Sequence, residues 1–194
     1  PSIIMSLNIS PETKVGKLDS WDAESFLKGK DKTYTINNKH GKEMTKLTTA
    51  EFGNFLKDNN VSVSSNGVIY TRDKRGLIPT LLEKWFDDRV QFRKLAKKFA
   101  EQGDKEKYAY FDRRQYIQKV VLNSLYGVLG LPVFRFYDLD NAEATTTTGV
   151  ELIKYTKLMA NHYYNSTLGD KDNYCIYIDT DSVFYSAIPI IKKK

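Results

Sequence analysis

The sequence predicts an α+β protein in which a long pair of antiparallel helices interrupts a region of short strands. Apolar and polar residues alternate over residues 61–78, and residues 174–184 have a strand composition broken by two acids. Between them, residues 79–128 carry a helical pattern broken once, at Gly103-Asp104. At 194 residues the chain fits one domain, or one domain with an inserted subdomain.

The N-terminal third gives few structural signals. Ser10-Pro-Glu-Thr13 indicates a turn or the start of a helix. Residues 14–60 are polar and rich in lysine, with a short helix expected at residues 48–58. The apolar anchors of this segment are scattered: Trp21, Phe26, Phe52, Phe55 and Leu56. We find no chemistry here and interpret the segment as a surface insertion.

Short strands and then two long helices are expected next. Tight turns around residues 65–67 and 73–76 would join the strands. Pro79 opens the first helix, since proline is tolerated in a first helical turn, and this helix runs to about residue 102. The second helix spans residues 105–128, and the short glycine-containing connection makes the two an antiparallel hairpin.

The last third combines an aromatic stretch, a helix and a strand. The aromatic stretch covers residues 133–138. A helix is expected over residues 141–165, although its threonines at positions 145–148 are β-branched and weaken that expectation. A turn at residues 169–173 leads into the strand that contains the two acids.

The net charge of +6 is concentrated in the helix pair. Residues 89–119 hold ten basic and four acidic residues, a net of +6, so the rest of the chain is neutral. Such a segment points to a polyanionic partner, with a solvated helix face as the alternative.

Composition also excludes several classes of protein. No apolar run approaches the roughly 20 residues that cross a bilayer, and we find no signal-peptide pattern. With His40, His162 and the single Cys175, the chain has too few ligands for a histidine and cysteine zinc site and cannot form an internal disulfide. Cys175 is most simply a small core residue in a reducing compartment.

Asp179 and Asp181 interrupt the last strand at a spacing of two residues. On a regular strand their carboxylates would share one face, whereas a tight turn would present them at the tip of a hairpin. Either arrangement forces two negative charges together, which is costly unless a cation offsets them. Mg²⁺ takes oxygen ligands of this kind, and the alternative is an aspartate-rich turn without a ligand.

The second long helix carries a polar stripe. Lys119, Asn123 and Tyr126 fall within about 60° of one another on a helical wheel, and Gly127 lies beside them. A phosphate-bearing ligand could use the lysine as a point charge, the asparagine as a hydrogen-bonding group and the tyrosine as a stacking surface. The opposite face, expected to be buried, holds Val121, Leu125 and Leu129.

The first long helix carries a matching basic stripe. Arg89, Arg93 and Lys97 follow one another at intervals of four residues. If the helices are antiparallel, this stripe can face Lys119, and cations that converge from two helices would suit a triphosphate. A solvated basic face remains the alternative.

Three motifs together resemble the polymerase motifs of family B DNA polymerases in order and spacing. They are Pro-Ser-Ile-Ile at residues 1–4, Lys-x-x-x-Asn-Ser-x-Tyr-Gly at 119–127 and Tyr-x-Asp-Thr-Asp-Ser at 177–182. Further stretches are similar to the T4-like bacteriophage members: Asn8-Ile-Ser-Pro-Glu-Thr13, Asn66-Gly67 with Gly76 and Pro79, and Arg135-Phe-Tyr-Asp-Leu139 with Asn141-Ala142. The resemblance covers nearly the whole chain and is weakest at residues 14–60.

This resemblance implies a DNA-directed DNA polymerase that uses two Mg²⁺ ions to add deoxynucleotides to a primer 3′ end. Asp181 would be the main metal ligand and Asp179 would support it, while Thr180 and Ser182 shape the hairpin. Arg89, Arg93 and Lys119 would bind the triphosphate of the incoming nucleotide, with Asn123 assisting. Tyr126 would line the nascent base pair.

The resemblance also implies the domain organisation and the partners. Residues 1–78 would form the N-terminal part of a palm with a polar insertion at about 14–60, residues 79–130 a fingers helical hairpin, and residues 131–194 the C-terminal part of the palm. Implied partners are primer–template DNA, deoxynucleoside triphosphates, exonuclease and thumb segments outside these residues, and a sliding clamp, with no membrane. The implied location is the cytoplasm of an infected host cell.

The chain departs from the family pattern in two places. Ile178 stands where the family commonly has glycine. The family's first motif continues N-terminally through an aspartate and a tyrosine, whereas Pro1 is the first residue here. We therefore expect a palm-and-fingers core fragment that is inactive in isolation, either truncated or naturally split. The alternative is a non-catalytic basic module or scaffold that binds nucleic acid in a salt-sensitive way, without Mg²⁺.

Overall fold

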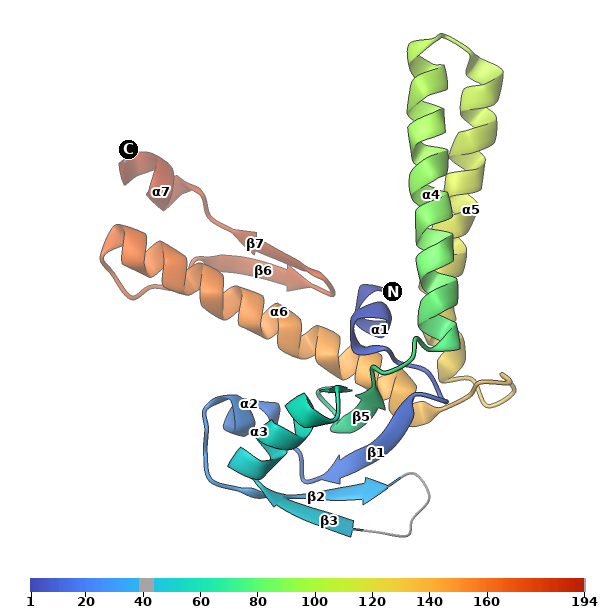
Figure 1. Ribbon diagram of the computed structural model, residues 1–194. Coiled ribbons are helices and arrows are strands. Elements are labelled where there is room, and N and C mark those ends of the chain that lie inside the picture. Colours follow the sequence, from blue (N-terminus) through green and yellow to red (C-terminus); the bar gives the residue numbers. More distant parts are fainter. Residues whose placement is uncertain (39–43, 194) are drawn as a thin grey trace. The chain divides into compact units, whose positions relative to one another are not determined.

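The computed structural model describes residues 1–38 and 44–193, which form seven helices and seven strands (Figure 1). Residues 1–145 make up one compact unit, here the first unit, and residues 146–194 make up the second unit. The strands pair antiparallel throughout, so the predicted α+β class is confirmed. In the described part of the chain, no helix combines the length and the apolar character that a membrane span requires.

A five-stranded antiparallel sheet organises the first unit. Its order is β3-β2-β1-β5-β4. The strands are β1 (Lys14–Asp19), β2 (Thr33–Asn38), β3 (Met44–Thr48), β4 (Val61–Val63) and β5 (Val68–Thr71). β4 and β5 form the hairpin predicted around residues 65–67. The second predicted turn, at residues 73–76, leads into a helix and not into another strand.

Residues 14–60 are more than a polar surface insertion, because they build an aromatic core against one face of the sheet. The scattered anchors meet there with Tyr34: the Trp21 ring centroid lies 5.4 Å from that of Phe26, 5.3 Å from Tyr34 and 5.6 Å from Phe52. Helices α2 (Ala23–Leu27) and α3 (Thr49–Asp58) carry two of these rings. α3 starts where predicted, at a capping box of Thr48 and Glu51.

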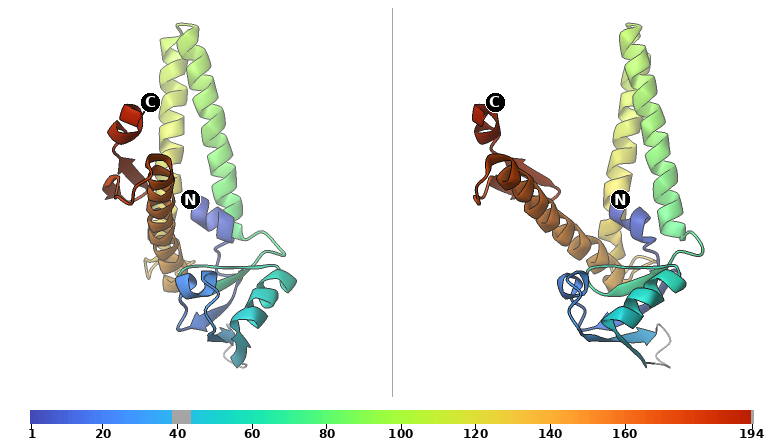
Figure 2. Two further views of the ribbon diagram at one scale, coloured as in Figure 1. Left: turned by 90° about the vertical axis from the view of Figure 1, so that its left-hand side faces the viewer. Right: turned by 60° about the vertical axis from the view of Figure 1, so that its left-hand side comes forward.

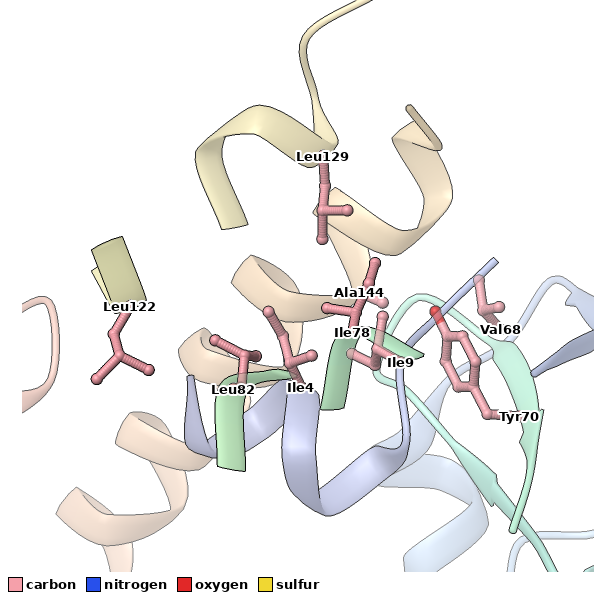
Figure 3. Close-up of a cluster of buried hydrophobic side chains, with 9 residues drawn as sticks. All are labelled: Ile4, Ile9, Val68, Tyr70, Ile78, Leu82, Leu122, Leu129 and Ala144. Atoms are coloured by element: carbon pink, nitrogen blue, oxygen red, sulfur yellow. The ribbon is translucent and has the colours of Figure 1, made fainter. Parts of the chain in front are cut away.

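Strand β5 is buried on both faces and separates this aromatic core from a second, central core. Ile69 belongs to the aromatic core and its neighbours Val68 and Tyr70 to the central one, as the alternation of side chains along a strand requires. Figure 3 shows the central core: Ile4, Ile9, Val68, Tyr70, Ile78, Leu82, Leu122, Leu129 and Ala144. These residues come from α1 (Ser2–Leu7), its following loop, β5 and the three long helices, so the core fixes the bases of those helices.

The two long helices predicted at residues 79–102 and 105–128 are present as α4 (Leu77–Glu101) and α5 (Lys105–Leu129). They run side by side (Figure 1, Figure 2). α4 begins two residues before Pro79. Its end is followed by Gly103 at φ 73°, a left-handed conformation that glycine adopts without a Cβ penalty. In the distal half, the Phe99 and Phe111 rings stack with centroids 5.5 Å apart.

The buried face of α5 is centred on Leu122. Leu129 is buried and Leu125 partly buried, as predicted, but Val121 is 36% exposed, so its assignment to the buried face is wrong. Adjacent helix positions differ by about 100°, so Leu122 and Val121 cannot both face the core. Leu122 is the one that joins the core cluster with Leu82 of α4.

The second unit has little core of its own. It comprises the C-terminal part of α6 (Leu139–Leu168), the hairpin of β6 (Cys175–Asp179) and β7 (Ser182–Tyr185), and α7 (Ile188–Lys193). The helix predicted at 141–165 is thus longer by a few residues at each end. Tyr164 stacks on Tyr174 and Tyr185. Among the described residues of this unit, Tyr174 alone is buried.

Candidate functional site

A groove of about 480 Å³ lies between α4 and α5. Arg89, Arg93 and Lys97 line it from α4 and Lys119 from α5, so the two basic stripes meet as the sequence spacing predicts. The remaining lining residues are Ala96, Tyr108, Asp112, Gln115 and Tyr116. The groove therefore presents four cations from two packed helices.

In the described part of the chain, the cations at the basal end of the groove have no counter-ions of their own. Within the residues that the structure describes, no carboxylate pairs with Arg89, Arg93 or Lys119. The Nε atom of Arg89 is buried and has no hydrogen-bond partner there. A buried donor without an acceptor is costly, and positive charges without counter-ions along a groove suit an anion with several oxygens.

Two further side chains in the groove affect its net charge. Lys97 Nζ lies 3.8 Å from Glu101 Oε1, an exposed pair that holds the lysine weakly. Asp112, the one carboxylate in the lining, accepts a hydrogen bond from Gln115 Nε2 at 3.0 Å. Positive charge thus predominates along the groove.

Asn123 and Tyr126 do not line the groove, although they share the α5 stripe with Lys119. Both are exposed, Tyr126 to 44%. A Cβ atom built at Gly127 would meet no other part of the described chain within 4 Å, apart from its own stretch of helix, so this side of α5 is open. The predicted polar stripe is therefore accessible, but the structure brings only Lys119 of it into the groove.

Sequence reasoning missed four groove residues on α5. Tyr108, Asp112, Gln115 and Tyr116 precede Lys119 by 11, 7, 4 and 3 positions. Those intervals keep them on the same helix face as Lys119. Extending the Lys119 stripe towards the N-terminus of the helix would have found them.

The two aspartates lie at the tip of the β6–β7 hairpin in the second unit, one of the two arrangements that the sequence allows. Asp179 pairs with Ser182, which leaves Thr180 and Asp181 as the turn. Thr180 has φ 47°, a left-handed conformation that β-branched residues rarely adopt. Thr180 Oγ1 donates to Asp179 Oδ1 at 3.0 Å, and both carboxylates are exposed.

The hairpin presents two of the several oxygen ligands that a divalent-cation site would need. Exposed carboxylates suit a hard cation such as Mg²⁺, which takes roughly six oxygen ligands. Across residues 1–38 and 44–193, however, no three histidine, cysteine, aspartate or glutamate side chains cluster as a metal site would require. His40 lies outside the described residues, and the half-buried Cys175 is a free thiol in β6. The donor chemistry fits the cation, and the ligand set needs further oxygens.

Comparison with known proteins identifies relatives of the whole chain. The family model described as DNA polymerase family B matches residues 1–189. The chain is 26% identical to the DNA-directed DNA polymerase of Escherichia phage RB69 and 27% identical to that of Enterobacteria phage T4. In each case the match covers 100% of this chain and 24% of the relative, so the chain spans about a quarter of their length.

A solved structure supports the same relationship. The structure of the family B DNA polymerase from the hyperthermophilic archaeon Pyrobaculum calidifontis matches with a TM-score of 0.56 and 25% sequence identity. The match covers 100% of this chain and 20% of that one. The shared fold therefore extends over all of the present sequence.

Proposed function

The chain belongs to DNA polymerase family B, and from that premise we propose that it is the nucleotide-binding core of a DNA-directed DNA polymerase. In the reaction, a primer 3′ hydroxyl attacks the α-phosphate of a deoxynucleoside triphosphate and pyrophosphate leaves. Residues 79–130 act as the fingers, and residues 1–78 and 131–194 act as parts of the palm. The observation that carries the proposal is the groove between α4 and α5, where cations from both helices converge.

The groove binds the triphosphate of the incoming nucleotide. Arg89 and Arg93 offer planar guanidinium groups that suit two phosphate oxygens at once, and Lys119 acts as a point charge. Negative charge that spreads over the phosphates during transfer is stabilised by these fixed cations.

The open side of α5 contacts the rest of the nucleotide. Asn123 assists at the phosphate end as a hydrogen-bonding group. Tyr126, an exposed residue of α5, lines the nascent base pair, where an aromatic face can pack against a base. Gly127 leaves room for this close approach. The second substrate is primer–template DNA.

Asp181 and Asp179 hold the divalent cations, with Asp181 as the main ligand. When bound, two Mg²⁺ ions would activate the primer hydroxyl and stabilise the leaving pyrophosphate. The turn of the β6–β7 hairpin keeps both carboxylates exposed for this role. Two carboxylates do not complete the ligand set, so we expect the 194-residue chain on its own to bind nucleotide but not to extend a primer.

The test is a titration of the chain with a fluorescent deoxynucleoside triphosphate, followed by anisotropy. We expect Arg89→Ala and Lys119→Ala each to raise Kd roughly tenfold, because each removes a charge-assisted contact. Lys94→Ala is the matched control, since Lys94 is exposed on α4 and does not line the groove. Equal losses in all three variants would indicate binding by total charge and would contradict the proposal.

A further inference from the structure

The loop Asn8–Thr13, which joins α1 to β1, packs against the first turn of α4. α1 lies beside the base of α4 in the views of Figure 2. Asn8, Ser10 and Thr13 are buried, with at most 2% of each exposed, although all three are polar. Buried polar side chains need hydrogen-bond partners, and the loop finds several of them at the start of α4.

The start of α4 cannot satisfy its own amides. A helix leaves its first N–H groups without partners inside the helix, and a serine, threonine, aspartate or asparagine at the N-cap normally accepts from one of them. Here the N-cap is Gly76, which has no side chain, and no side-chain cap forms within α4. Pro79, in the first turn, has no N–H to satisfy.

The loop supplies the missing acceptors from 65 to 68 residues earlier in the sequence. The N–H of Gly76 donates to Asn8 Oδ1 at 2.9 Å, that of Leu77 to Glu12 Oε1 at 2.5 Å and that of Ile78 to Ser10 Oγ at 3.4 Å. With Pro79 next in sequence, the opening amides of α4 are accounted for. The Glu12 carboxylate also carries the charge that the positive end of a helix favours.

Asn8 connects three elements through one side chain and one backbone position. It ends α1 with φ 60° and ψ 41°, a left-handed conformation that asparagine tolerates better than most residues. Its side-chain amide donates to Thr71 O at 2.7 Å, at the end of β5, and to Lys74 O at 2.9 Å. Its Oδ1 accepts from Gly76, so the ends of α1 and β5 and the start of α4 are held together.

The packing at this point leaves no room for another side chain. A Cβ atom built at Gly76 would lie 2.7 Å from the Cβ of Ser10 and 3.1 Å from Cγ2 of Thr13. The loop and the helix start are therefore in direct van der Waals contact as well as hydrogen-bonded.

We propose that Asn8, together with Ser10 and Glu12, is a positioning residue that sets the direction in which α4 leaves the sheet. The groove cations depend on that direction, because Arg93 lies sixteen residues beyond Leu77, about 24 Å along a helix. A small rotation at the base of α4 is thus enlarged at the groove. The link to nucleotide binding rests on the proposed function, whereas the link to helix direction rests on the hydrogen bonds alone.

The first test measures the direction of α4 without any ligand. Spin labels are placed at Ala50→Cys on α3 and Gln102→Cys at the end of α4, both exposed positions, with Cys175→Ser removing the native thiol. Asn8→Asp keeps the size of the side chain but points carboxylate oxygen at the carbonyls of Thr71 and Lys74. Pulsed electron paramagnetic resonance measures the distance between the labels. We expect a narrow distance distribution in the labelled protein that retains Asn8, and a broader or shifted one in Asn8→Asp.

A matched control and a milder variant complete this test. Asn59→Asp changes an exposed asparagine, the C-cap of α3, whose side-chain amide donates to Phe55 O at 2.9 Å, and should leave the distance unchanged. Glu12→Ala removes one exposed acceptor and serves if Asn8→Asp fails to fold, as judged by circular dichroism. If the folded variants of the loop retain the narrow reference distribution, the proposal is overturned.

The second test connects the loop to the groove. We expect the Kd for the fluorescent deoxynucleoside triphosphate to rise about fivefold in Asn8→Asp, the size of effect typical for loss of a helix cap. Lys119→Ala should weaken binding without changing the label distance, so the two roles separate. If Asn8→Asp alters the label distance but not the Kd, the positioning role is refuted. If the labelled protein with Asn8 intact binds no nucleotide, the proposed function is refuted, and the label distance alone then decides whether the loop sets the direction of α4.

Discussion

The two hairpins of this chain carry different halves of the proposed chemistry, and they differ in how complete each half is. The α4–α5 hairpin gathers four cations from two helices along one groove. The β6–β7 hairpin offers two exposed carboxylates, and the described residues add no third ligand. Phosphate binding needs positive charges spread along a surface, which one helix pair can provide. A metal site needs several oxygens around one point, which a single turn cannot provide.

The hairpins also differ in what holds them. The bases of α4 and α5 are packed into the central core, which includes Leu82, Leu122 and Leu129. The β6–β7 hairpin belongs to a unit in which Tyr174 is the one buried residue among those described. Burial of apolar surface stabilises the first arrangement far more than the second. The groove should therefore be preformed, whereas the carboxylate pair needs additional support.

The largest effect should follow from removing the support of the first hairpin. Leu82 is fully buried at the base of α4, and Leu82→Ala should lower the free energy of unfolding by about 2–5 kcal/mol. Urea unfolding followed by tryptophan fluorescence measures it, since Trp21 and Trp85 both lie in the first unit. Leu158→Ala, at a position 65% exposed on α6, should stay within about 0.5 kcal/mol. Similar losses of unfolding free energy in the two variants would contradict the stated difference between the two hairpins.

A second prediction concerns the groove itself. The double variant Arg89→Ala/Lys119→Ala should raise Kd for a deoxynucleoside triphosphate roughly 100-fold, since each cation makes its own contact. The double variant Lys94→Ala/Lys105→Ala makes the same change in net charge outside the groove lining and should alter Kd less than about threefold. Anisotropy titrations at one ionic strength compare the two. If the control double variant binds the nucleotide as weakly as the groove double variant, the position of the cations does not determine binding.

A smaller effect is expected from pH at the base of α4. Partial burial raises the pKa of the Glu12 carboxyl, but hydrogen bonds from the Leu77 N–H and the Ser10 hydroxyl, with Lys74 nearby, lower this pKa below its ordinary value. A carboxyl with a depressed pKa stabilises the fold above its ordinary pKa of about 4.3 and loses that contribution as the pH falls. The Tm advantage over Glu12→Gln should therefore be present at pH 6 and shrink towards pH 3. A Tm difference between the two proteins that stays constant from pH 6 to pH 3 would contradict this role of the Glu12 carboxylate.

The helix pair and its cations could be predicted from sequence because their signals are local. Helical spacing places Arg89, Arg93 and Lys97 on one stripe, and a short connection makes the helices antiparallel. The aspartate hairpin follows from a turn motif inside a strand composition in the same way. These features need no knowledge of distant residues.

The rest depended on contacts between distant residues. The aromatic core joins Trp21, Tyr34 and Phe52, which are scattered over a polar segment and meet only in the folded chain. The capping of α4 by Asn8 and Glu12 crosses more than sixty residues. Packing against α4 buries Leu122 in place of Val121. The sequence pattern defines the buried face of a helix only to within about one residue.

The most direct test of the contrast between the hairpins is a calorimetric titration of a deoxynucleoside triphosphate in Mg²⁺ against three forms of the chain: unaltered, Lys119→Ala, and Asp179→Asn/Asp181→Asn. If the groove is complete and the carboxylate pair is not, Lys119→Ala should raise Kd roughly tenfold. The double aspartate variant should then bind within about twofold of the unaltered chain, since two exposed carboxylates alone hold Mg²⁺ weakly. A loss of affinity in the aspartate variant as large as that in Lys119→Ala would contradict the account.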